Sequence, residues 1–223
     1  FGPDMPFRAG SSASAVIEDQ IYIAGGIDID GDSTISTTAK LDPRTRAWTL
    51  LAPMPLPRHH AASATDGTRL YVFGGRGPGS RGGHVLAKGF DDVQVYDPAT
   101  DSWTVSRPGP TAPAPLPQAR GGTGKAVYAG GRFWVFGGET AGADTAGATR
   151  NEVYDRVDVY DPVTNTWTSG PPLPTARHGV LPVLRDGHIF VAGGGVRPGA
   201  SRSRVLEILR LSIGPAERVR PED

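Results

Sequence analysis

Four apolar segments that each run into a pair of glycines constrain this chain more than any other feature. The segments are IYIAGG, LYVFGG, FWVFGG and IFVAGG, and they begin at residues 21, 70, 133 and 189. Their β-branched, aromatic and small apolar residues favour short strands. Adjacent glycines at the end of a strand permit positive φ angles and close approach of neighbouring backbones. Self-similarity of this kind indicates a repeat protein in which each repeat is one structural unit.

The segments around each glycine pair recur in one fixed order. A proline motif that ends in Arg precedes the pair, in the forms MPFR (5–8), PLPR (55–58), PLPQAR (115–120) and PLPTAR (172–177). After a variable loop, a third apolar run ends in Asp-Pro, at KLDP (40–43), VYDP (95–98) and VYDP (159–162). A Trp follows each Asp-Pro, at positions 48, 103 and 167. Short strands separated by Gly, Asp and Pro turns predict a four-stranded antiparallel meander in each repeat.

A repeat of this composition has to bury its apolar faces against its neighbours. One four-stranded sheet cannot cover both of its own faces, whereas sheets stacked around an axis cover one another. We therefore expect an all-β fold with no α-helix of consequence. Trp48, Trp103 and Trp167 are expected to fill the space between neighbouring sheets. Each indole N–H then needs a hydrogen-bond acceptor, because it is removed from water.

The order Gly-Gly, Tyr-Asp-Pro, Trp, Pro and Arg resembles the kelch repeat, and the resemblance covers roughly residues 5–212. It implies a kelch-type β-propeller over residues 1–213, built from four-stranded antiparallel blades, with a polar tail at 214–223. About four blades are expected in this chain, at approximately 9–53, 58–107, 120–170 and 177–213.

Both ends of the chain depart from the repeat. The first residues, 1–8, look like the end of a fourth strand whose Trp is absent. In the last repeat, the run 203–213 reads as the third strand, and neither Asp-Pro nor Trp follows it. The resemblance implies six or seven blades in a complete ring. The four repeats therefore indicate part of a larger parent, or a small ring closed in an unusual way, with an oligomer as one means of completing it.

Composition excludes several classes of function. The 23 Lys and Arg residues balance the 23 Asp and Glu residues, so nothing draws the whole molecule toward nucleic acid or an anionic membrane. No apolar run approaches the roughly 20 residues that cross a bilayer, so no membrane insertion is expected. The first residues lack the basic start and apolar core of a signal peptide. The residues themselves assign no compartment, and analogy alone favours an extracellular or periplasmic one.

Residues just before the innermost strand of each blade are the candidate binding residues. The resemblance implies that these positions and the long loops after the glycines share one face around a central channel. The candidates are Arg8, Arg58, His59, His60, Arg120, Arg177 and His178. Converging arginines would form a fork-shaped receptor for a carboxylate, a phosphate or an acidic peptide loop. The favoured alternative for the arginines is structural bracing, because they recur in every repeat, whereas the histidines break the repetition.

The loop after the first glycine pair contains an alternating acidic motif. Asp28, Asp30 and Asp32 surround Gly31 in an arrangement similar to an oxygen-rich calcium loop. No Glu stands at the twelfth position and no helix is expected beside the motif, so an acidic turn is the favoured interpretation. Calcium is the one cofactor considered, and no other is expected.

The favoured function is a binding scaffold that recognises a protein or a glycan through the channel-mouth face, rather than an enzyme. The kelch fold also includes galactose-oxidase-like copper enzymes, but these need a cross-linked Cys, which this chain lacks. A carbohydrate-active enzyme of the sialate-epimerase kind is the alternative. Its candidate groups here are Arg58, Arg120, Arg177, His60, His178 and Glu139. A third interpretation is a structural module of an extracellular assembly.

Overall fold

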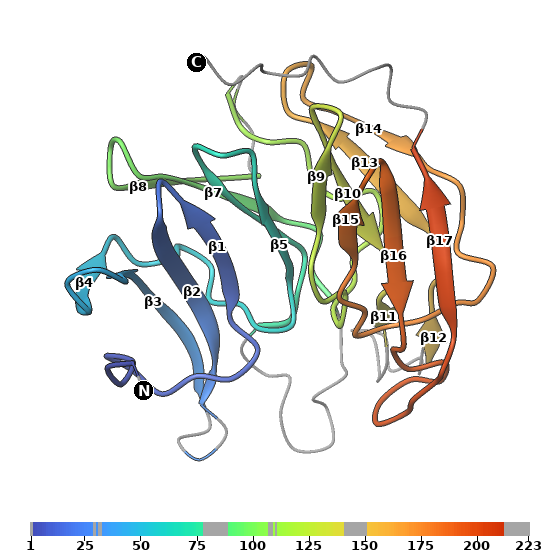
Figure 1. Cartoon of the computed structure of the whole chain (residues 1–223), viewed down its shortest axis with the longest axis horizontal. Helices are drawn as coiled ribbons and strands as arrows, with labels where there is room; N and C mark the ends of the chain where they lie inside the picture. The colour runs from blue at the N-terminus through green and yellow to red at the C-terminus, as the bar shows by residue number, and fades with distance from the viewer. Residues whose placement is uncertain are drawn as a thin grey trace, which may run out of the picture.

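The computed structural model describes residues 2–28, 30, 33–77, 89–106, 109, 111–140 and 151–211. Within these ranges all regular structure is β, and none of the described residues forms a helix that could cross a membrane. Four sheets follow one another along the chain as the blades of a β-propeller (Figure 1). The all-β, kelch-type propeller predicted from the sequence is confirmed.

Each blade is an antiparallel meander. Blade 1 consists of β1 (Ala13–Ile17), β2 (Gln20–Asp28), β3 (Ser33–Asp42) and β4 (Ala47–Leu51). Blade 2 consists of β5 (Ala62–Thr65), β6 (Leu70–Phe73), β7 (Val93–Asp97) and β8 (Ser102–Val105). Blade 3 consists of β9 (Val127–Ala129), β10 (Arg132–Phe136), β13 (Val157–Asp161) and β14 (Thr166–Ser169). Blade 4 consists of β15 (Val183–Arg185), β16 (His188–Ala192) and β17 (Leu206–Arg210). A separate hairpin is formed by β11 (Glu139–Thr140) and β12 (Glu152–Val153).

The strands of blade 4 agree with the prediction from the sequence, and those of blade 1 differ from it. In blade 4, β17 pairs with β16 as the third strand, which confirms the prediction for the last repeat. In blade 1, β2 does not end at the glycine pair but continues to Asp28, and β3 begins at Ser33, so strand replaces part of the loop expected after the first glycine pair. A register shift between Ala24 and Gly26 absorbs the irregularity, and the ladder resumes with Gly26 opposite Ile35.

Apolar clusters fill the junctions between successive blades. Between blades 1 and 2, the rings of Tyr22 and Tyr96 lie 6.0 Å apart. Between blades 2 and 3, the rings of Phe73 and Phe133 lie 5.4 Å apart, and Trp167 packs edge-on against Phe73 at 5.7 Å. The Tyr and Phe rings are buried together with the small and aliphatic residues around them, and Trp167 is half-buried against them, so burial of apolar area holds the blades together.

Two of the three tryptophans that were expected between neighbouring sheets bind the chain of the preceding blade in the same way. Trp103 Nε1 donates a hydrogen bond to Ala52 O at 2.9 Å, and Trp167 Nε1 donates to Ala114 O at 3.0 Å. The expected place of these indoles between neighbouring sheets is confirmed.

The backbone N–H groups of the same alanines are bound by side chains from the turn before each Trp. Ala52 N donates to Asp101 Oδ1 at 2.8 Å, and Ala114 N donates to Asn165 Oδ1 at 2.6 Å. The backbone N–H and C=O of each alanine are thereby hydrogen-bonded, as a buried junction requires.

Trp48 is the exception, because no described blade precedes blade 1. Its buried Nε1 has no hydrogen-bond partner among the described residues. Arg46 stands at the position of Asp101 and Asn165, and a guanidinium accepts no hydrogen bond. The expectation that Trp48 lies between two sheets is therefore wrong for the described part of the chain.

The repeated glycines are explained by contacts between consecutive blades. Gly25 has a φ of +65°, and a Cβ there would lie 2.6 Å from Arg58 O. Gly74 has a φ of +61°, and a Cβ there would lie 2.7 Å from Arg120 O. Gly137 is placed in the same way against the segment that enters blade 4. A side chain at these positions would push the next blade away, and its backbone conformation would be strained.

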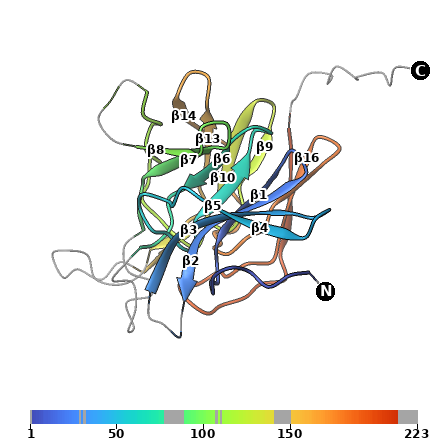
Figure 2. The same cartoon turned by 90° about the vertical axis from the view of Figure 1, so that its left-hand side faces the viewer.

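The described blades form an open arc. β1 contacts β5, β5 contacts β9 and β9 contacts β15, whereas no contact of comparable extent joins the described strands of blades 1 and 4. Blade 1 lies at the left of Figure 1 and blade 4 at the right, and Figure 2 turns blade 1 toward the viewer. Val16 and Leu50 of blade 1 and Val183 and Ile208 of blade 4 are exposed. Each end of the arc therefore has apolar side chains that no described blade covers.

Candidate functional site

A belt of backbone hydrogen bonds links the four blades just before their inner strands. His60 N donates to Ser11 O at 3.1 Å, Gly122 N to His60 O at 2.9 Å, and Gly179 N to Gly122 O at 2.5 Å. All four residues have left-handed φ angles, of +54° at Ser11, +52° at His60, +63° at Gly122 and +62° at Gly179. We call these four residues the belt.

His60 is the one belt residue with a large side chain. Left-handed φ costs a residue with a Cβ about 1–2 kcal/mol, and glycine avoids that cost at two of the other positions. A strained residue that persists where glycine would fit supports a functional role for its side chain. His60 Nε2 lies 3.1 Å from Ser11 Oγ, and its Nδ1 lies 2.6 Å from His59 Nδ1.

The two adjacent imidazoles are held in the neutral form. Burial lowers the pKa of both His59 and His60 to about 4, and the positive charge of Arg76 contributes in the same direction. In the neutral pair one Nδ1–H donates a hydrogen bond to the other, unprotonated Nδ1, which accounts for the short contact. An anion bound beside His60 would favour its protonated form and raise its pKa.

A cavity with several polar groups in its lining opens beside the belt. It has a volume of about 260 Å³ and lies among inner-strand and belt residues of all four blades. Its polar lining consists of Ser11, Ser12, Ser14, Ser63, His60 and Lys125. The hydroxyl groups can donate or accept, whereas the Lys125 ammonium only donates. We call this space the belt cavity, and its chemistry suits a carboxylate or a hydroxyl-bearing group.

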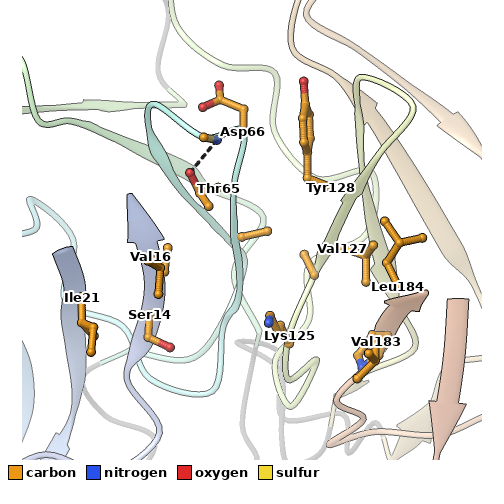
Figure 3. Close-up of a pocket in the computed structure, with 15 residues that line it drawn as sticks. Ser14, Val16, Ile21, Thr65, Asp66, Lys125, Val127, Tyr128, Val183 and Leu184 are labelled. Carbon is orange, nitrogen blue, oxygen red and sulfur yellow. Dashed lines mark hydrogen bonds between the residues drawn. The ribbon is translucent and has the colours of Figure 1, made fainter. Parts of the chain in front are cut away.

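A larger cavity of about 650 Å³ follows the inner strands along the centre of the arc, and we call it the channel cavity. Figure 3 shows Ser14 and Lys125 at one end of it and Asp66 and Tyr128 at the other. Ser14 and Lys125 line both cavities, so the belt cavity and the channel cavity adjoin at these two residues. Val183 is among the apolar residues of its wall. The channel is therefore basic near the belt and acidic at its far end, with an apolar surface between.

The three recurring arginines at the blade entries hold acidic side chains of their own blades. Each guanidinium is buried, with side-chain exposures of 4%, 0% and 0% for Arg58, Arg120 and Arg177. The ion pairs are Arg58–Asp92 at 2.5 Å, Arg120–Asp158 at 2.7 Å and Arg177–Glu207 at 2.6 Å. Arg58 also stacks on Phe90, with its guanidinium carbon 3.8 Å from the ring centroid. This geometry agrees with bracing. Of the candidate binding residues, only His60 lines the belt cavity, together with Lys125.

Arg8 differs from the other three arginines. Its side chain is 79% exposed and pairs with Asp30 at 2.8 Å. The sequence placed Arg8 with the recurring arginines, but the structure pairs it with the acidic motif instead.

Another buried ion pair joins blades 2, 3 and 4 behind the belt, and only its Glu139 member was among the candidates from the sequence. Arg76 Nη2 lies 2.5 Å from Glu139 Oε1, and both side chains are 3% exposed. His178 Nδ1 lies 3.4 Å from the same oxygen, and Gly199 N donates to Glu139 Oε2 at 2.8 Å. Arg76 and Glu139 each directly follow a glycine pair, and this shared position is the signal that could have added Arg76 to the candidates.

Comparison with known sequences agrees with this architecture. Residues 2–194 match the family described as the KLHDC2/KLHL20/DRC7 Kelch-repeats domain. The chain belongs to the kelch-repeat family. Its relatives include Kelch-like protein terF of Aspergillus terreus, which is 32% identical over 92% of this chain and 42% of that protein. They also include N-acetylneuraminate epimerase of Escherichia coli O139:H28, which is 29% identical over 92% of this chain and 60% of that protein.

A structural comparison supports the kelch fold alone. The solved structure of YjhT aligns with a TM-score of 0.73 and 24% identity, and the alignment covers 96% of this chain and 66% of that one. The chain thus spans part of the length of the relatives it matches, including 42% of Kelch-like protein terF.

The predicted acidic calcium motif is only partly within the described residues. Asp32 lies outside them, and Asp30 is paired with Arg8. In the described part of this kelch chain, no group of three His, Asp or Glu side chains could hold a metal ion. The polar tail at 214–223 and most of the loops at 76–90 and 139–154 also lie outside the described ranges.

Proposed function

We propose that this kelch propeller is a binding scaffold that holds a segment of a protein partner in the belt cavity. The observation that carries the proposal is His60, a residue with left-handed φ at a position where blades 3 and 4 have glycine. Its imidazole lines the belt cavity together with Lys125 and several serine hydroxyls. Function placed on loops of a rigid scaffold is the usual arrangement in such proteins.

An acidic side chain of the partner is the best chemical match for the belt cavity. The Lys125 ammonium supplies positive charge, and His60 becomes a cation when an adjacent carboxylate raises its pKa. The channel cavity beyond adds an apolar wall with Val16, Val183 and Leu184. Polar and apolar groups at these places fit a peptide loop, which presents both kinds of side chain, better than a sugar.

Binding is better supported than catalysis by the state of the candidate acid–base groups. The Glu139 carboxylate is buried, and both of its oxygens have donors. Arg58, Arg120 and Arg177 have acidic partners within their own blades. A free base and acid pair facing the cavity would be needed for proton transfer.

Selection of peptides tests the proposal. A phage-displayed library of random 12-residue peptides would be selected against the chain, and the binders measured on the Lys125→Met and His60→Gly variants. We expect enrichment of Asp and Glu and at least tenfold weaker binding to both variants. Selected peptides that bind both variants as well as the parent chain would contradict the proposal.

A sugar ligand is the second candidate, because one relative is named N-acetylneuraminate epimerase and the cavity would also accept a carboxylate-bearing sugar. Saturation-transfer NMR with N-acetylneuraminate tests binding, and the same spectra report epimerisation. A saturable signal that Lys125→Met abolishes would favour the sugar over the peptide.

Calcium binding and completion of the ring by an oligomer stay predictions. A thermal shift on calcium addition would support an ion at Asp28, Asp30 and Asp32. Light scattering on the chain would detect an oligomer that covers the open blade faces.

A further inference from the structure

The channel cavity has opposite charges at its two ends. Lys125 lies at the end beside the belt, whereas Asp66 and Tyr128 line the other end, which we call the far end (Figure 3). The wall between them includes the apolar side chains of Ala64 and Val127. Its volume of about 650 Å³ lies within the range of ligand sites, which combine an apolar lining with a few polar groups that fix orientation.

Asp66 is ionised and has no charged partner in the described part of the chain. Its Oδ1 accepts hydrogen bonds from Thr68 N and Arg69 N, both at 2.8 Å. Burial by itself raises the pKa of Asp66, but these hydrogen bonds outweigh it and hold the pKa below its ordinary value. No described Lys, Arg or His side chain forms an ion pair with Asp66.

The arginines that follow the inner-strand turns of blades 2 and 3 do not neutralise this charge. Arg69 pairs with Asp97 at 3.0 Å, and Arg132 pairs with Asp161 at 3.4 Å. Neither arginine lines the cavity, and about half of each side chain is exposed to solvent. Among the described residues, Asp66 therefore leaves the far end with a negative charge.

Tyr128 adds an aromatic ring at the same end, on the wall across from Asp66 (Figure 3). The ring packs on Phe133 with 4.7 Å between the centroids, which fixes its position. Burial raises the pKa of Tyr128, and the negative charge of Asp66 adds to the rise, so the phenol lies in the field of that carboxylate. The face of an aromatic ring attracts an ammonium or guanidinium group. A carboxylate and a phenol ring at one end of a cavity thus match a cation.

Chain geometry limits the distance between the two ends. Lys125 and Tyr128 are three residues apart, on β9 and the segment that enters it. An extended chain advances about 3.3–3.6 Å per residue, so their Cα atoms are no more than about 11 Å apart. In an extended ligand the same distance separates residues i and i+3. One short segment therefore reaches both ends of the channel cavity.

We propose that the far end is a cation subsite, which binds an arginine or lysine side chain of the partner protein. The inference rests on the proposed function, because an acidic side chain of the same segment occupies the belt cavity beside Lys125 and His60. The basic residue lies three positions from the acidic one, beside Asp66 and Tyr128, and the residues between them are small or apolar. An acidic sugar without an amine has no group for this subsite, so the subsite favours a peptide.

Matched peptides test the subsite on the intact chain. The probe is acetyl-Asp-Val-Ala-Arg-amide, and acetyl-Arg-Val-Ala-Asp-amide covers the opposite chain direction. In a second pair citrulline replaces Arg, which keeps the shape of the side chain and removes its charge. Calorimetric titration should show saturable binding, at least fivefold tighter for the Arg peptide of the preferred direction than for its citrulline counterpart. This preference should decrease as salt is raised, because added ions screen the charges.

Three protein variants locate the interaction, with circular dichroism confirming that each is folded. Asp66→Asn removes the charge and keeps an oxygen for the turn hydrogen bonds, so it should bind Arg and citrulline peptides equally. Asp19→Asn is the matched control, because this exposed residue lies in the corresponding turn of blade 1 and does not line the cavity. It should retain the preference for Arg. Lys125→Met should weaken both peptides and also retain the preference.

The outcomes separate this inference from the proposed function. Equal binding of Arg and citrulline peptides in both directions would overturn the cation subsite alone. So would a preference for Arg that persists in folded Asp66→Asn or disappears in Asp19→Asn. The absence of saturable binding of any of the peptides at millimolar concentration, or binding that Lys125→Met leaves unchanged, would overturn the proposal that a peptide occupies these cavities, and the subsite with it.

Discussion

The hydrogen bond from Trp103 to Ala52 allows a direct measurement of what joins the blades. Trp103→Phe removes the indole N–H and leaves Ala52 O at the junction without its donor. Loss of the bond costs about 1–2 kcal/mol when an acceptor is left unsatisfied, and the smaller ring adds about 1 kcal/mol for the space it leaves. We expect Trp103→Phe to destabilise the chain by about 2–3 kcal/mol.

Trp48→Phe is the matched control, because it removes the same atoms from an indole whose N–H has no described partner. It should cost less than about 1 kcal/mol, since deleting an unsatisfied N–H offsets part of the lost contact. For a domain of this size, 1 kcal/mol corresponds to about 2–4 °C in Tm. Trp103→Phe should therefore lower Tm by about 4–12 °C, and Trp48→Phe by no more than about 4 °C.

Thermal unfolding followed by far-ultraviolet circular dichroism is the assay, because fluorescence itself changes when a Trp is removed. Urea unfolding at constant m value provides the free energies. Equal destabilisation by the two substitutions would refute the reasoning that the Trp–carbonyl bond, rather than the ring alone, secures the junction.

Three further predictions concern stability. Because the folded-state pKa values of His59 and His60 are lowered to about 4, the unfolded chain takes up protons first as pH falls below about 6.5, so stability should be lost between about pH 6.5 and 4. Urea titrations across this range should show a loss of about 2–3 kcal/mol after solvent screening, and a flat profile would contradict it. Arg120→Met should cost about 3–5 kcal/mol in urea unfolding, because it removes the fully buried one of the two arginines that pair with the Asp158 carboxylate and leaves only the half-buried Arg156. A loss below about 1 kcal/mol would show that the brace is dispensable. Gly74→Ala should lower Tm by at least about 5 °C, since a Cβ there meets Arg120 O at a φ of +61°, while Gly67→Ala, with open space around it, serves as the strain-only comparison.

Most of the fold could be predicted from the motifs that recur in each repeat. The order of glycine pairs, Asp-Pro and Trp predicts the blades because each mark acts within one repeat or on the next one. The places of Trp103 and Trp167 follow from this order, and so does the third strand of blade 4. The lack of a described hydrogen-bond partner for the Trp48 N–H could not be predicted from its own repeat, because the acceptor for this N–H would come from a neighbouring blade.

The site was less accessible to sequence reasoning. The recurring arginines were visible, but the distant acids that pair with them, such as Asp158 and Glu207, have no fixed spacing from them. Arg76 and Glu139 pair between blades 2 and 3, so no pattern within one repeat predicts their contact. The left-handed backbone of His60 emerges only when the belt closes hydrogen bonds between blades.

The open arc has a consequence for cooperativity. Among the described residues, blades 2 and 3 each pack against a neighbouring blade on both sides, whereas blades 1 and 4 each pack against one blade only. In a quasi-linear array with nearest-neighbour coupling, the terminal units fray first and the interior ones resist longest. Amide hydrogens of β6 and β10 should thus exchange with solvent only through global unfolding. Those of β3 and β17 should exchange sooner, through local unfolding of the terminal blades.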